Sequence, residues 1–177
     1  ILREALKLAP RRQELYYHLA VNVAKQGRLA EGLELAKTAL DMSTEVPRAN
    51  FHYALLLAAN ERNEEAEKAL EHAVELDPNL STFLGSDHNS ILMLYESWGR
   101  TDKVLELTWK SVEGTIADKF NVEYYRIALG EYAKERNREK FIATARFLGN
   151  YASAERDNMD VLIDLAEKGL WDVIGKL

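Results

Sequence analysis

The amino-acid sequence predicts an all-α fold, a right-handed α-solenoid built from about four to five stacked helix–turn–helix hairpins. First, the chain contains only three prolines and nine glycines, and Ala, Leu, Glu, Lys and Arg recur at spacings of three and four, which is typical of helices. Second, no stretch alternates convincingly as a strand does. Third, Ala5, Ala39 and Ala73 are each 34 residues apart, and a fixed period of this length indicates a helical repeat array.

The first elements follow this period. Residues 1–10 have the apolar spacing of one helix face, and Pro10 ends the pattern. In the 34-residue register this segment is the second helix of a hairpin whose first helix is absent, so we expect the chain to be a length of solenoid cut from a longer protein. Gly27 separates the helices of the first complete hairpin. The two complete hairpins are predicted over residues 12–26 with 29–42, and 48–61 with 63–76.

The later units depart from the period. Gly99 lies 72 residues after Gly27 rather than 68, which places four extra residues within 79–90. Helix pairs are nevertheless predicted over 89–114 and 122–149, and a degenerate final pair after residue 157. We expect one domain, residues 1–177, divided into 1–12 (second helix of a truncated repeat), 13–46 and 47–80 (well-formed repeats), 81–118 and 119–150 (divergent repeats) and 151–177 (degenerate or capping helices).

The two regular units resemble the tetratricopeptide repeat family, whose unit is a 34-residue helix–turn–helix with small residues where its helices cross. Three positions depart from the family pattern: Gly32 replaces an alanine, Thr44 a proline and Asn50 a large aromatic residue. The matching residues are Tyr16, Leu19, Ala20, Ala36, Ala39, Tyr53, Ala54, Ala66, Leu70, Ala73 and Pro78. The resemblance implies a concave surface that is lined by first helices and holds a peptide or partner segment.

We predict the partner-binding residues in two steps. One face of the first helix is assigned to packing, and the adjoining face is taken as concave. Its equivalents in later repeats are found by adding the repeat length to each residue number. Val21, Leu55 and Met93 stand where the chaperone-tail binders of the family carry carboxylate-clamping side chains, so a carboxylate clamp is disfavoured. The predicted concave-face residues are Tyr17, His18, Val21, Phe51, His52, Leu55, Asn89, Met93, Tyr125, Arg126, Leu129 and Tyr132. Tyrosine and arginine are effective anchors for an apolar segment. The alternative is that this apolar stripe is buried core, as such stripes usually are.

The sequence does not predict an enzyme, a metal site or a cofactor. His18 and His52 are one repeat apart, too far for joint coordination without further ligands, and no H-E-x-x-H spacing occurs. The segment "GSDHNS" (85–90) contains hydrolase-type residues, but no nucleophile elbow precedes Ser86, and Ser86 and Asp87 suit the start of a helix. No glycine-rich phosphate loop is present. We therefore expect a non-enzymatic scaffold for a protein or peptide.

Composition limits the partners further. The formal net charge is −6, the wrong sign for a surface that neutralises many phosphates, so we expect no nucleic-acid partner. No apolar run reaches the roughly 18 residues of a membrane-spanning helix, so no membrane insertion is predicted for this fragment. The chain has no cysteine, which suits both a cytoplasmic and a periplasmic location.

Two other functions stay open on the sequence. The segment "LAPRRQELYYHLA" (8–20) resembles the repeats that follow the membrane core of O-antigen-ligase or polymerase-like bacterial proteins, which implies an accessory tail of a larger glycan enzyme. Alternatively, exposed terminal helices could stack on a second copy, with Leu2 and Leu6 in the contact. Charged residues at these two positions would then weaken a homo-oligomer.

Overall fold

The structure, a computed structural model, describes residues 1–117 and 119–177 and divides into two units, Ile1–Asp87 and His88–Leu177. All regular elements in these ranges are helices. The end predicted for the third repeat, residue 118, lies outside the described residues, and the repeat boundaries stay a prediction. No helix in the described ranges combines the length and the apolar character needed to cross a bilayer.

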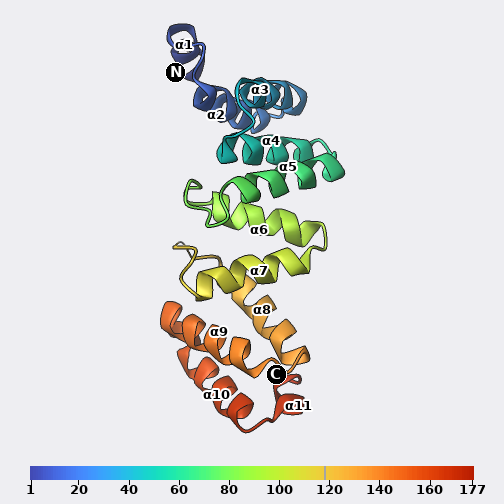
Figure 1. Cartoon of the computed structure of the whole chain (residues 1–177), viewed down its shortest axis with the longest axis vertical. Coiled ribbons are helices and arrows are strands. Elements are labelled where there is room, and N and C mark those ends of the chain that lie inside the picture. The colour runs from blue at the N-terminus through green and yellow to red at the C-terminus, as the bar shows by residue number, and fades with distance from the viewer. Residues whose placement is uncertain (118) are drawn as a thin grey trace. The chain divides into compact units, whose positions relative to one another are not determined.

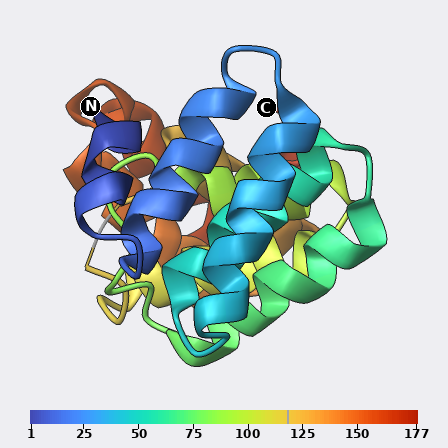
Figure 2. The same cartoon turned by 90° about the horizontal axis from the view of Figure 1, so that it is seen from above.

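The first unit consists of consecutive helical hairpins. Helix α2 packs against α3 and α4 against α5, and α3 in turn contacts α4 (Figure 1). Seen from above, α2 and α3 run side by side and are joined by a tight turn (Figure 2). The helices are α1 (Leu2–Leu8), α2 (Gln13–Ala24), α3 (Leu29–Met42), α4 (Pro47–Ala59) and α5 (Asn63–Leu76). The predicted class, an all-α fold of consecutive hairpins, is confirmed.

The second unit repeats this arrangement with less regular lengths. Helix α9 packs against both α8 and α10, and α7 contacts α8. The side chains of Asn121 and Asn137 accept hydrogen bonds from the amides of Glu123 and Lys140, both at 3.2 Å, and so fix where α8 and α9 begin. The helices are α6 (Asp87–Ser97), α7 (Thr101–Val112), α8 (Val122–Lys134), α9 (Arg138–Tyr151), a 3₁₀ turn (Ser153–Glu155), α10 (Arg156–Glu167) and α11 (Trp171–Ile174).

The three departures from the repeat pattern have structural reasons. A Cβ atom at Gly32 would lie 2.8 Å from Leu56 Cδ1 and 2.9 Å from the carbonyl oxygen of Ala20. The approach of α3 to α2 therefore leaves no room for alanine. The other two departures contact each other, because the buried Asn50 amide donates a hydrogen bond to the Thr44 carbonyl at 2.6 Å. This bond joins the start of α4 to the preceding turn.

The extra residues between α5 and α6 fold onto the first unit. The Asp77 carboxylate accepts hydrogen bonds from the Thr82 amide and hydroxyl, both at 2.7 Å, and from the Ser81 hydroxyl at 3.0 Å. Burial raises the pKa of Asp77, but the hydrogen bonds from Thr82 and Ser81 outweigh burial and hold that pKa below its ordinary value. The turn places Leu80 and Phe83 in the core, where each is 1% exposed.

Candidate partner-binding surface

A residue with a positive φ follows the first helix of each hairpin, and the spacing of these residues shows which positions of successive first helices are equivalent. The turn residues are spaced 34, 38, 37 and 33 apart along the chain. Three of them are glycine, which adopts a positive φ without strain, and two are not. They are Gly27 (φ 83°), Glu61 (62°), Gly99 (71°), Arg136 (52°) and Gly169 (71°).

In the first unit, three of the predicted site residues with ring side chains are buried. Tyr17, Phe51 and His52 are 2%, 0% and 6% exposed. The Phe83 ring stands edge-on to Phe51 with the ring centroids 5.5 Å apart, so the inserted turn covers Phe51. The expectation that these side chains line an open face is therefore corrected, and the alternative of a buried stripe describes them. His18, Val21 and Leu55 are half-buried and stay accessible.

A polar cluster joins the start of α4 to Asp87, the last residue of the first unit. Arg48 Nη2 lies 3.6 Å from Asp87 Oδ2, and the Arg48 guanidinium lies 5.6 Å from the centroid of the Tyr17 ring. His52 Nδ1 donates a hydrogen bond to the Arg48 carbonyl at 2.7 Å. The Arg48 cation is thus balanced within the cluster.

Burial decides the protonation of the two histidines beside this pair. It lowers the pKa of His52 to about 4, although the hydrogen bond to the Arg48 carbonyl acts in the opposite direction. Burial also lowers the pKa of His18 and raises the pKa of Tyr17. Both histidines and the tyrosine are therefore neutral near pH 7. The centroids of the two imidazole rings are 5.9 Å apart, so the expectation that the two histidines lie far apart is corrected. The described residues hold no group of three or more side chains that could bind a metal ion.

In the second unit the predicted register of α8 was wrong by one residue. The predicted site places Tyr125 36 residues after Asn89, whereas the turn at Arg136 lies 37 residues after Gly99. One residue rotates a helix face by about 100°. Tyr125, Leu129 and Tyr132 consequently lie on the packing face and are 0%, 6% and 2% exposed. Arg126 does reach the surface, and pairs with Glu155 at 2.6 Å.

The Tyr125 hydroxyl makes two buried hydrogen bonds. Its hydroxyl lies 2.8 Å from Ser111 Oγ and accepts a hydrogen bond from the Phe120 amide at 3.1 Å. These contacts fasten the loop after α7 to α8, and burial raises the pKa of Tyr125. On α6, Asn89 Oδ1 accepts a hydrogen bond from the Asn121 amide at 2.7 Å, while Met93 is 53% exposed.

A groove of about 1210 Å³ lies between α8, α10 and α11 in the second unit. Of the predicted site residues only Leu129 lines this groove. No sequence pattern indicated the groove, because α11 is too short to show helical periodicity. Apolar side chains supply much of the groove lining. They are Leu129, Phe141, Met159, Val161, Leu162, Trp171, Ile174 and Leu177.

Charged residues surround the groove and are mostly paired. Arg136 contacts Asp172 at 3.2 Å, and Lys134 contacts Glu131 at 2.6 Å. Lys176 also lines the groove, and the described ranges hold no ion-pair partner for it. The Lys176 ammonium is therefore a cation without an ion-pair partner in the described ranges, beside the apolar side chains of the groove.

A series of helical hairpins with an apolar groove defines a helical-repeat protein. Residues 23–82 match the family model for the tetratricopeptide repeat. Among solved structures, the crystal structure of MamA is similar over 90% of this chain and 87% of that chain, with 17% identity and a TM-score of 0.57. This likeness shows the fold. No curated protein matches the sequence significantly.

These findings confirm the resemblance on which the sequence interpretation depended. Repeats of this family are generally non-catalytic and suggest a protein–protein interaction scaffold with protein partners. The resemblance to glycan ligases, the homo-oligomer and the absence of a nucleic-acid partner stay predictions.

Proposed function

We propose that the chain is a non-enzymatic scaffold that holds an apolar segment of a protein partner in the groove between α8, α10 and α11. The observation that carries the proposal is the groove itself, which is lined by apolar side chains and by the Lys176 ammonium. Sites for small molecules usually enclose about 300–1,000 Å³. A larger open groove suits several side chains of one segment.

The groove's charges indicate the kind of segment. Asp172 is neutralised by Arg136, and Glu155 by Arg126, whereas Lys176 is unbalanced. A segment with apolar side chains and one carboxylate placed near Lys176 would complement this surface. Half-buried residues of α2 and α4, among them Val21 and Leu55, extend the accessible apolar area of the first unit.

The test uses Gly130, which lines the groove and has open space where a Cβ would stand. A random peptide library displayed on phage is selected on the wild-type chain and on Gly130→Leu, which fills the groove. Asn150→Leu, on the exposed part of α9, is the matched control. We expect wild type and Asn150→Leu to enrich the same apolar peptides with an acidic residue.

Synthetic versions of the enriched peptides should then bind Gly130→Leu at least tenfold more weakly than wild type, as measured by tryptophan fluorescence. A library that gives no enrichment, or peptides that bind all three proteins equally, would exclude the groove as the binding surface.

A further inference from the structure

A second cavity of about 390 Å³ lies in the same unit, between α7, the α8–α9 turn and the start of α9. It shares no lining residue with the groove. Trp109 from α7 and Tyr132 from α8 form its aromatic wall, with the ring centroids 6.3 Å apart and the rings nearly perpendicular. Glu113, Glu135 and Lys140 supply charge.

The Tyr132 hydroxyl is unusual in this wall. The residue is 2% exposed, and its hydroxyl is buried without a hydrogen-bond partner among the described residues. Leaving a buried polar group unpaired is destabilising, and native structures contain few such groups. Burial, with the nearby Glu135 and Glu113 carboxylates, raises the pKa of Tyr132 to about 12, so the hydroxyl keeps its proton.

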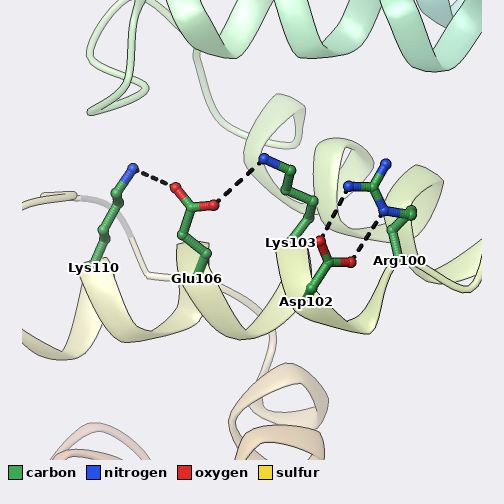
Figure 3. A network of polar contacts seen from close by, with 5 residues as sticks. All are labelled: Arg100, Asp102, Lys103, Glu106 and Lys110. Carbon is green, nitrogen blue, oxygen red and sulfur yellow. Dashed lines mark hydrogen bonds and ion pairs between the residues drawn. The ribbon is translucent and has the colours of Figure 1, made fainter.

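The carboxylates of the cavity fall into two groups. Glu106 is held by Lys110 at 2.9 Å and lies 3.6 Å from Lys103, and Asp102 is held by Arg100 at 3.1 Å (Figure 3). These contacts lower the pKa of Asp102 and of Glu106. Glu113 and Glu135 take part in no ion pair within the described ranges.

A cation of the chain already lies against the aromatic wall. The Lys140 ammonium is 5.2 Å from the centroid of the Trp109 ring and 5.6 Å from that of Tyr132. The Lys140 ammonium and the Glu113 and Glu135 carboxylates line the same cavity. The balance of these three groups is negative, and it favours one further positive charge.

We infer that this cavity binds the guanidinium group of an arginine side chain of a protein partner. A guanidinium carries five N–H donors in one plane, enough to serve Glu113, Glu135 and the oxygen of the Tyr132 hydroxyl together. Such charge-assisted hydrogen bonds are stronger than neutral ones. The inference does not depend on the groove, since the two surfaces are lined by different residues.

The experiment follows the indole N–H signal of Trp109 by NMR, assigned with Trp109→Phe, while the signal of Trp171 serves as an internal reference. The probes are the peptide acetyl-Gly-Arg-Gly-amide, its counterpart with neutral citrulline in place of arginine, and free arginine. We expect the Trp109 signal to move saturably with the arginine peptide, and the citrulline peptide to bind at least tenfold more weakly. Free arginine should bind more weakly than the arginine peptide.

Three variants locate the interaction. Tyr132→Phe should weaken binding of the arginine peptide at least threefold. The melting temperature of this variant should stay equal to or above that of wild type, because the lost hydroxyl has no protein partner among the described residues. The double variant Glu113→Gln with Glu135→Gln should weaken binding of the arginine peptide at least tenfold. Glu139 is an exposed carboxylate outside the cavity, so Glu139→Gln should leave binding of the peptide unchanged.

The inference is overturned if the Trp109 signal does not move. It is also overturned if the citrulline peptide binds wild type as tightly as the arginine peptide does, or if the arginine peptide binds the cavity variants as tightly as it binds wild type. Free arginine that binds as tightly as the peptide would show a small-molecule site, and so would overturn the assignment to a protein partner.

Discussion

The ring of Phe83 meets that of Phe51 edge-on, at an interplanar angle of 89° and a centroid separation of 5.5 Å. Edge-to-face geometry of this kind is favourable for aromatic pairs. Phe83 belongs to the segment that interrupts the 34-residue period, and Phe51 belongs to a regular first helix. The insertion is therefore part of the core of the first unit.

We predict that Phe83→Ala destabilises the chain by roughly 3–5 kcal/mol, the usual cost of removing a buried phenylalanine side chain. Phe83→Leu preserves most of the volume and should cost clearly less. Urea unfolding followed by circular dichroism measures both. A loss below about 1 kcal/mol for the alanine variant would show that the insertion does not contribute to the core.

A second prediction concerns two helical glycines with opposite surroundings. Gly32→Ala should destabilise the chain by about 1–3 kcal/mol, because its Cβ would overlap the Ala20 carbonyl oxygen and Leu56. Gly130→Ala should instead stabilise it by roughly 0.5–1 kcal/mol, since open space surrounds that Cβ and alanine favours the helix. Thermal melts of the two variants check this, and shifts of the same sign would contradict it.

The turns give a third prediction. Glu61 has a φ of 62°, whereas Gly27 occupies the same place in the preceding hairpin. The left-handed conformation costs a residue with a side chain about 1–2 kcal/mol. Glu61→Gly should therefore leave stability unchanged or raise it by up to about 1 kcal/mol, and Gly27→Glu should lower it. If Glu61→Gly melts several degrees below wild type, contacts of the Glu61 side chain outweigh the backbone strain.

The fold class was predictable because it depends on local composition and on a period that repeats along the chain. Helices α3 and α5 have the bounds expected from the sequence. The site was less predictable, since it depends on register and on non-local contacts. An assumed spacing of 36 instead of 37 residues moved Tyr125, Leu129 and Tyr132 to the wrong helix face.

The contact between Phe51 and Phe83 could not be foreseen, because Phe83 comes from the segment without periodicity. The groove depends on the short α11 and the last residues of the chain, which have no repeat equivalent to compare with. By contrast, the departures at Asn50 and Thr44 were visible in the sequence. Their direct hydrogen bond shows that paired departures from a repeat pattern can indicate a contact.

The last prediction concerns pH. The pKa of His52 is about 4 in the folded chain and about 6.5 for an unperturbed histidine. Between these values the unfolded state binds more protons than the folded state, so stability falls as the pH falls. The contribution is fully present above about pH 6.5, and roughly 1 kcal/mol should be lost between pH 7 and pH 5.5. The lowered pKa of His18 acts in the same direction.

The measurement is the melting temperature of wild type and of His52→Gln over this pH range. A loss of about 1 kcal/mol corresponds to a decrease of roughly 2–4 °C for a chain of this size. The decrease should be smaller in His52→Gln, because glutamine does not titrate while the remaining groups are unchanged. Parallel pH profiles for the two proteins would show that His52 titrates alike in the folded and unfolded states, and thus that its burial does not hold it neutral.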